Sequence, residues 1–226
     1  MTAASVHAAL RHRVLQVLIA IAATSAVGGN VTRAASGDAA AAARVEQSLG
    51  ELRTLESRFE QTLSGKHGEV LERASGTLYI QKPDRFRWVY ETGVRQLIVS
   101  DGTRLWLYDQ ELDQVTVRAL GQSLAATPAS LLSGTGHAAD SFRITDLGAY
   151  ENLDWVRLLP KTADTDFREI RLGFSGRDVV RMTLKDKLGQ TTELKFLALK
   201  RNPALDASLF HFEPPAGVDV IGNPGP

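Results

Sequence analysis

The side chains best suited to catalysis or metal binding are scattered along this 226-residue chain. Three of its five histidines, His67, His137 and His211, lie in the main body of the sequence, and no two of them form an H-x-H or H-x-x-x-H pair. A zinc site takes three or four protein ligands, so this spacing predicts no metal site. The absence of cysteine excludes a thiolate zinc site, a cysteine nucleophile and an iron–sulfur cluster.

Local motifs for hydrolysis or phosphate binding are also incomplete. The segment 121–125 (GQSLA) lacks the final glycine of a G-x-S-x-G nucleophile elbow. Gly134 and Gly136 form a lone pair outside any strand–helix context, which is too little for a phosphate loop. We therefore predict no catalytic residue and no cofactor, and we interpret the chain as a non-enzyme. A secreted lipid or glycan hydrolase stays an alternative, because Ser, His and Asp side chains can converge in space from distant positions.

The N-terminus has the three-part pattern of a secretory signal peptide. Residues 1–35 contain no acidic side chain, and Arg11 and Arg13 precede the mostly apolar run 14–27. Small residues follow, so we expect cleavage between positions 26 and 36. A membrane anchor is the alternative, although the run is short for a transmembrane helix.

Removal of residues 1–35 leaves a single predicted domain, 36–226. The full chain carries 26 basic and 26 acidic side chains. Loss of Arg11, Arg13 and Arg33 leaves 23 basic and 26 acidic ones, a formal charge of −3. This mildly acidic domain shows no basic excess that would indicate nucleic-acid binding.

Helical patterns occur in two places. Residues 38–55 are predicted to form an amphipathic helix, because apolar residues recur every three or four positions at Val45, Leu49, Leu52 and Leu55. The pattern does not decide whether Phe59 continues this helix or begins a strand. Thr127 and Pro128 predict the start of a short helix that includes Leu131 and Leu132 and ends at Gly134.

The rest of the domain is predicted to be β-structure. About ten short strands follow one another at even spacing, which favours a strongly curved antiparallel sheet or barrel over a βαβ fold. These strands are 76–81, 86–91, 97–99, 105–108, 114–120, 142–147, 155–159, 167–174, 179–184 and 191–199.

The hairpin 97–108 is unusual because both of its faces are apolar. A two-residue turn at Asp101 and Gly102 would pair Ile98 with Leu105 and Leu97 with Trp106. An antiparallel sheet usually has one wet face. Either helices cover the second face, or the sheet encloses an apolar space that binds a ligand.

Several motifs of the chain occur in the order and spacing of a known family. They are 59–61 (FEQ), 76–80 (GTLYI), 82–88 (KPDRFRW), 99–102 (VSDG), 105–108 (LWLY), 127–132 (TPASLL), 210–215 (FHFEPP) and 217–220 (GVDV). Over roughly residues 44–221 the sequence resembles the periplasmic outer-membrane lipoprotein carriers of the LolA family. The resemblance implies an incomplete, half-open antiparallel β-barrel of ten to eleven strands, mainly β with helices that form a lid.

The resemblance also implies a function and a set of site residues. The carrier would be a periplasmic monomer that takes acylated lipoproteins from an inner-membrane ABC-type releasing complex (LolCDE-like) and delivers them to an outer-membrane acceptor (LolB-like). Lys82 stands where the family often has an arginine that bonds lid carbonyls, so we expect it to be the lid latch. The predicted acyl-binding cavity is lined by Phe86, Trp88, Tyr90, Leu97, Val99, Leu105 and Trp106, and the predicted lid helices contribute Val45, Leu49, Leu52, Leu131 and Leu132.

Two other functional classes fit the same half-barrel. One is a lipid-binding outer-membrane acceptor, and the other is a module of an envelope-stress sensor. The lack of cysteine disfavours a lipid-anchored acceptor, and the single short domain disfavours a multidomain sensor.

Overall fold

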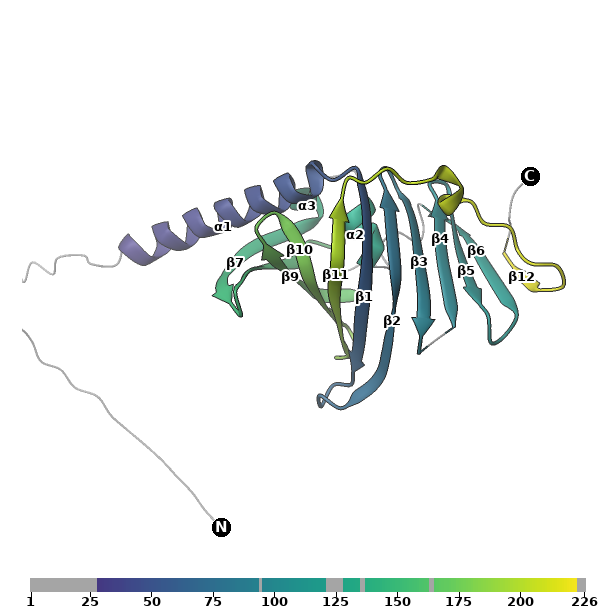
Figure 1. Ribbon diagram of the computed structural model, residues 1–226. Coiled ribbons are helices and arrows are strands. Elements are labelled where there is room, and N and C mark those ends of the chain that lie inside the picture. The colour runs from purple at the N-terminus through teal and green to yellow at the C-terminus, as the bar shows by residue number, and fades with distance from the viewer. Residues whose placement is uncertain (1–27, 94, 121–127, 135–136, 163–164, 223–226) are drawn as a thin grey trace, which may run out of the picture.

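The structure is a computed structural model that describes residues 28–93, 95–120, 128–134, 137–162 and 165–222. Its main element is one sheet in the strand order β12-β6-β5-β4-β3-β2-β1-β11-β10-β9-β8-β7 (Figure 1). Neighbouring strands are antiparallel except β12, which runs parallel to β6. The strands β7 and β12 form the two free edges, so the sheet is open, as a half-open barrel requires.

The strands of the sheet divide between two halves of the chain. The first half contains β1 (Thr54–Ser64), β2 (Val70–Gln81), β3 (Arg85–Thr92), β4 (Gln96–Asp101), β5 (Arg104–Asp109) and β6 (Gln114–Ala119). The second half contains β7 (Phe142–Tyr150), β8 (Leu153–Pro160), β9 (Phe167–Ser175), β10 (Asp178–Asp186), β11 (Thr191–Arg201) and the short β12 (Asp219–Ile221). The sequence patterns predicted all of these strands except β1 and β12.

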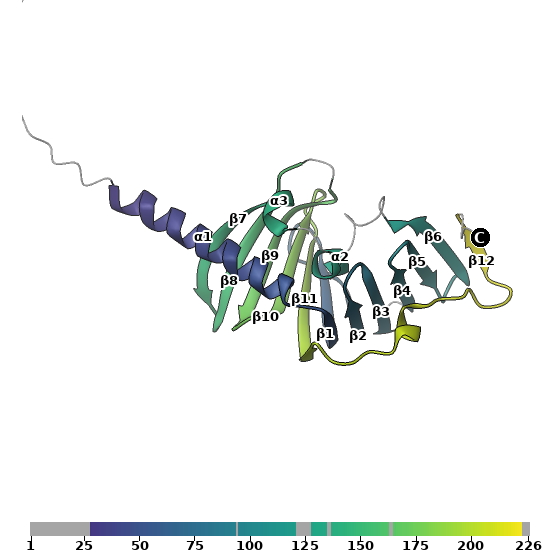
Figure 2. The same cartoon turned by 90° about the horizontal axis from the view of Figure 1, so that it is seen from above.

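Few helices accompany the sheet. Those among the described residues are α1 (Gly28–Gly50), α2 (Pro128–Ser133), α3 (Ala138–Ser141) and the 3₁₀ turn η3 (Ala207–Phe210). The helix α1 passes along the β7–β10 side of the sheet, and α2 lies close to β2 and β3 (Figure 2). None of the described helices is long and apolar enough to cross a membrane.

The first helix ends earlier than its spacing predicted. It stops at Gly50, and Leu52 lies in the connection to β1, where its N–H donates to the Leu49 carbonyl at 3.3 Å. Leu55 and Phe59 belong to β1, where Leu55, Ser57 and Phe59 alternate on one face. The prediction was wrong here because Leu52, Leu55 and Phe59 are three and four residues apart, as in a helix, although Leu55 and Phe59 lie on one face of a strand. Hydrogen bonds to both β2 and β11 favour the strand.

The sheet has two apolar faces, and each belongs to a separate core. The inner face carries the inner cluster, which includes Phe59, Trp88, Leu105 and Leu194 and also holds Val45 and Leu49 of α1. The outer face of β4–β6 carries the outer cluster of Leu97, Val99, Trp106, Val115 and Val117. Both faces are therefore covered, although by different parts of the chain.

The register of the 97–108 hairpin differs from the prediction. Val99 pairs with Trp106 and Ser100 with Leu105, so the two residues between the strands are Gly102 and Thr103 instead of Asp101 and Gly102. Asp101 holds the turn in this position, because its carboxylate accepts hydrogen bonds from the Thr103 and Arg104 N–H groups, both at 2.8 Å. The cross-strand partner of each residue shifts by two positions relative to the prediction, so every side chain keeps its face.

Candidate functional site

Aromatic side chains gather at the centre of the inner face. The ring of Phe59 lies 4.8 Å from that of Trp88 and 5.2 Å from that of Tyr90, measured between centroids. Phe59 belongs to β1 and the other two to β3, so their rings meet across β2. Gly76 of β2 is paired with both Phe59 and Tyr90, and its missing side chain leaves the space that the Phe59 ring enters. Phe86 is buried on the same face of β3.

Tyr90 contributes a neutral polar group to this aromatic set. Its hydroxyl donates to Gln61 Oε1 at 3.0 Å. Burial raises the pKa of Tyr90 to about 12. The phenol therefore stays protonated near neutral pH, and the inner face carries no charge from this residue.

The predicted cavity residues lie on two different faces. Phe86, Trp88, Tyr90 and Leu105 belong to the inner face. Leu97, Val99 and Trp106 belong to the outer cluster, on the opposite face of the sheet. Because both faces of the hairpin are apolar, alternation alone could not distinguish them. The inner side of this hairpin is made by Leu105 together with Ile98 and Leu107, which the prediction missed.

The C-terminal segment explains why the outer face is apolar. Phe212 packs against Trp106 and Tyr108, with ring centroids 5.7 and 6.0 Å apart, and Val218 packs on the same cluster. This segment runs from η3 across β4–β6 to β12, which hydrogen-bonds to β6 (Figure 1). The outer cluster is therefore a structural core, and we exclude it from the candidate site.

Asp101 joins the hairpin loop to the outer cluster. Its Oδ2 accepts from Trp106 Nε1 at 3.1 Å, in addition to the loop contacts of Oδ1. Burial raises the pKa of Asp101, but the hydrogen bonds from Thr103, Arg104 and Trp106 outweigh burial and hold the pKa well below its usual range.

Acid is therefore expected to destabilise the fold through Asp101. A carboxylate whose folded pKa lies below its unfolded value stabilises the protein above the unfolded pKa, and this contribution is lost as the pH falls through the folded pKa. Urea unfolding should show a smaller difference in unfolding free energy between the wild type and Asp101→Asn at pH 3 than at pH 7. A constant difference would contradict this role. Asp109→Asn, at an exposed turn of the neighbouring loop, serves as the control.

Two helices cover parts of the inner cluster. Val45 and Leu49 of α1 are buried in it, together with Leu132 of α2, and Leu131 packs against it half-buried. Leu52 is buried in the same cluster, but it lies in the connection after α1 and not in a helix. Four of the five predicted lid residues are thus helical side chains in contact with the inner cluster.

The C-terminal end of α1 is held by three polar side chains at the ends of β2 and β11. Lys82 Nζ donates to the Leu49 carbonyl at 2.7 Å, and Arg201 Nη2 donates to the Ser48 carbonyl at 2.5 Å. Asn202 Nδ2 donates to the Glu51 carbonyl at 3.2 Å. The last carbonyls of a helix lack intrahelical partners and carry partial negative charge, so cationic donors suit this place.

The environment of Lys82 is restrictive for a cation. Burial, followed by repulsion from Arg201, lowers the pKa of Lys82 from its usual value. Sequence reasoning placed Lys82 at the lid but missed Arg201 and Asn202. The β1–β11 pairing brings these two residues to the helix end, and no local motif marks Arg201.

Glu46, near the C-terminal end of α1, joins this helix to α3. Its carboxylate lies 2.9 Å from His137 Nδ1 and accepts from the Ala139 N–H at 3.0 Å. The hydrogen bond to Glu46 raises the pKa of the exposed His137 above its ordinary value. The helices α1 and α3 are therefore linked to each other as well as to the sheet.

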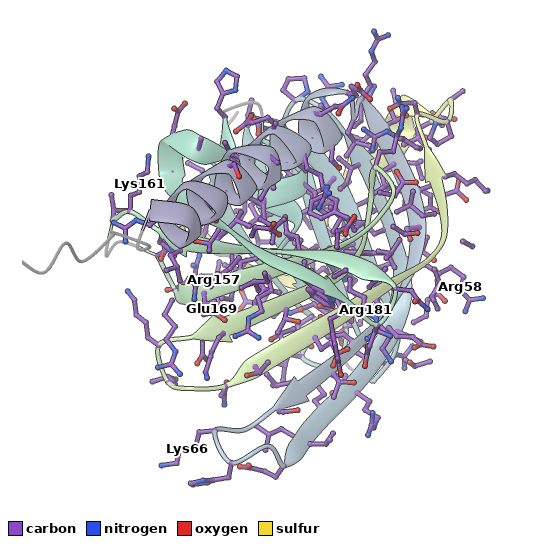
Figure 3. The ribbon with its side chains drawn as sticks, turned by 90° about the vertical axis from the view of Figure 1, so that its left-hand side faces the viewer. Arg58, Lys66, Arg157, Lys161, Glu169 and Arg181 are labelled. Carbon is purple, nitrogen blue, oxygen red and sulfur yellow. The ribbon has the colours of Figure 1, made fainter. Side chains whose placement is uncertain are left out.

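Charged side chains lie on the outer face of β1, β8 and β10, beside the apolar Leu147 and Trp155. Arg58, Arg157 and Arg181 project from β1, β8 and β10 on this side (Figure 3). A pocket of about 380 Å³ there contains Arg181, which forms ion pairs with Glu151 at 3.1 Å and Glu193 at 3.7 Å. Within the described ranges, no three His, Asp or Glu side chains come together to hold a metal ion. The inner face is consequently the best candidate for binding an apolar ligand.

A solved structure supports the fold. The chain resembles an uncharacterized conserved protein from Thermus thermophilus with a TM-score of 0.50 and 15% identity, over 79% of this chain and 94% of that one. At this level of identity the likeness concerns the fold alone.

Sequence comparisons identify the family. Residues 50–213 match the family model for the outer membrane lipoprotein carrier protein LolA. The outer-membrane lipoprotein carrier protein of Dechloromonas aromatica is 43% identical over 77% of this chain and 84% of its own length. That of Chromobacterium violaceum is 40% identical over 84% of this chain and 91% of its own length. The chain therefore belongs to the LolA family of outer membrane lipoprotein carrier proteins.

Proposed function

We propose that this protein is a periplasmic carrier that binds the acyl chains of lipoproteins and moves them to the outer membrane. The observation that carries the proposal is the aromatic inner face under two helices, in a chain whose relatives bear the name of lipoprotein carriers. Aromatic side chains suit this role because they supply apolar area without demanding one chain length.

The energetics explain why a carrier is needed. Burial of one CH₂ group is worth about 0.8 kcal/mol, so a sixteen-carbon acyl chain in water costs roughly 12 kcal/mol. Spontaneous escape of a lipoprotein from the membrane is therefore negligible. A carrier without its own energy source must also release the cargo, which requires a cover whose open and closed states differ little in free energy. The polar contacts at the end of α1, beside the buried Val45 and Leu49, are the part of this cover that a few side chains control.

The same proposal assigns the remaining parts of the chain. Residues 1–35 are a signal peptide cleaved between 26 and 36, and residues 36–226 form one carrier domain. The donor of cargo is an inner-membrane ABC-type complex (LolCDE-like), and the recipient is an outer-membrane acceptor (LolB-like). Lys82 acts as the latch of the cover, and transfer itself uses no catalytic group.

Two neighbouring residues on opposite faces of β5 provide the test. Leu107 is half-buried on the inner face, and Tyr108 is half-buried on the outer face. Leu107→Glu places a charge on the acyl-binding face and should reduce the amount of bound lipoprotein about tenfold or more. Tyr108→Glu should leave binding close to that of the wild type.

The measurement is native mass spectrometry of the protein purified from the periplasm with a co-expressed lipoprotein. The wild type should form a stoichiometric complex, and circular dichroism should confirm that both variants are folded. Equal loss in both variants, or a wild type that never retains acylated cargo, would contradict the proposal. A complex retained only when the lipoprotein is acylated would separate lipid binding from protein–protein contact.

A further inference from the structure

One tryptophan of the inner face lacks the hydrogen bond that the other tryptophans make. The chain has three tryptophans. Trp106 Nε1 donates to Asp101 Oδ2 at 3.1 Å, and Trp155 Nε1 donates to the Tyr150 carbonyl at 3.1 Å. Trp88 Nε1 is buried and has no partner.

No protein acceptor lies within hydrogen-bond distance of Trp88 Nε1. Its cross-strand partners are Leu78 on β2 and Ile98 on β4, which have no polar side-chain atoms. The ring of Phe59 lies 4.8 Å away, and the nearby Tyr90 hydroxyl is engaged with Gln61. The other buried side-chain atoms without a partner in the described residues belong to Gln81, Ser133 and Arg157, outside the aromatic set. The unpaired N–H is therefore a particular feature of the candidate binding face.

Such a group is costly in a folded protein. A buried donor without an acceptor loses its hydrogen bonds to water and gains none in return, so nearly all buried polar groups in native structures are paired. The indole N–H can only donate, so whatever satisfies it must bring an acceptor. Phenylalanine at this position would supply similar apolar area without this cost, so apolar packing alone does not explain the indole N–H.

We propose that the Trp88 indole N–H donates a hydrogen bond to an ester carbonyl oxygen of the lipid carried by the cargo. This inference rests on the proposed function and specifies its chemistry. An acyl chain consists of CH₂ groups without acceptors, and the ester carbonyl at its head is the acceptor that must accompany it onto an apolar face. Ile98 and Leu107 on the β4–β5 side of Trp88 are only partly buried, whereas Leu78 on the other side is fully buried. The acyl chain therefore lies along β4 and β5, with its ester group at Trp88.

The test compares two lipids in two proteins. The probes are synthetic lipopeptides that carry two hexadecyl chains on a glyceryl-cysteine with a free amine, joined either by esters or by ethers. The quantity compared is the ratio of the affinity for the ester lipid to the affinity for the ether lipid. This ester-to-ether ratio should be about five- to tenfold higher in the wild type than in Trp88→Phe, which is the value of one buried hydrogen bond. Binding of the ether lipid should change by less than about twofold, because the apolar ring remains.

Tyr90→Phe is the matched control, since it removes a polar group from the same face that is already paired within the protein. It should leave the ester-to-ether ratio at the wild-type value. A second readout is the proton NMR signal of the Trp88 indole N–H, which should move downfield with the ester lipid and not with the ether lipid.

The outcomes separate this inference from the proposed function. Tight binding of both lipids with the same ratio in wild type and Trp88→Phe overturns the role of Trp88 and leaves the carrier function standing. Failure of both lipids to bind the wild type overturns both. A changed ratio together with the ester-specific NMR shift supports the assignment of the N–H to an ester carbonyl.

Discussion

Replacing Lys82 with leucine is expected to free the end of α1 and to speed the exchange of bound lipoprotein by about 10- to 100-fold. Lys82 Nζ is 2.7 Å from the Leu49 carbonyl, and hydrogen bonds that involve a charged group contribute about 1.5–3 kcal/mol. Leucine keeps much of the apolar contact of the lysine stem but offers no donor. The open state of the cover should therefore become more populated in the variant. Stopped-flow release of a fluorescent lipopeptide measures the exchange rate, and hydrogen exchange of residues 45–52 measures the opening.

Two controls make this experiment specific. Lys82→Arg should retain slow exchange, because arginine also donates to carbonyl oxygens. Lys200→Leu removes a lysine of β11 that forms an ion pair with Glu56 on the outer face. The Lys200 side chain is 62% exposed. This variant should leave exchange unchanged, as surface ion pairs contribute little. If Lys82→Leu releases cargo at the wild-type rate and protects residues 45–52 equally well, Lys82 is not the latch.

Gly76→Ala is expected to lower the free energy of unfolding by about 3 kcal/mol or more. A Cβ atom at this position would lie 1.8 Å from the Val89 carbonyl oxygen and 3.0 Å from the Phe59 ring. The first distance involves backbone atoms of β3, so the β2–β3 pairing has to move. The second would push Phe59 away from Trp88 and Tyr90. Urea unfolding followed by tryptophan fluorescence measures the loss.

Gly50→Ala provides the comparison for this substitution. Gly50 is the last residue of α1, and a Cβ atom there would have no atom within 4 Å. This variant should be as stable as the wild type or slightly more stable, because alanine restricts the unfolded chain more than glycine does. Equal stability of the two alanine variants would show that the close packing at Gly76 is not needed.

The sequence predicted the local features of the fold better than the long-range ones. The strands after residue 75 show clear alternation, so the antiparallel sheet was predictable. The strand β1 was hidden because Leu55 and Phe59 extend the spacing of the preceding helix. Its identity depends on hydrogen bonds to β2 and to β11, and β11 lies far along the chain.

The candidate site shows the same division. Phe86 and Trp88 could be placed in one apolar layer from their alternation with Arg87 and Val89. The assignment of Trp106 to the opposite face depends on Phe212, which is distant in sequence and covers the outer side. The contact between Lys82 and α1 was expected through the family resemblance, whereas Arg201 reaches the same helix end without any sequence signal.

The central position of β1 has a consequence for how the molecule assembles. Ser57 of β1 donates to the Leu197 carbonyl of β11, and these residues are 140 positions apart in the chain. Loop closure over such a distance has a high entropic cost, and proteins dominated by distant pairings fold slowly. The first six strands cannot complete the inner face alone, because β1 lacks one neighbour until β11 arrives. The inner face is therefore completed only after β11, in the C-terminal third of the chain, has paired with β1.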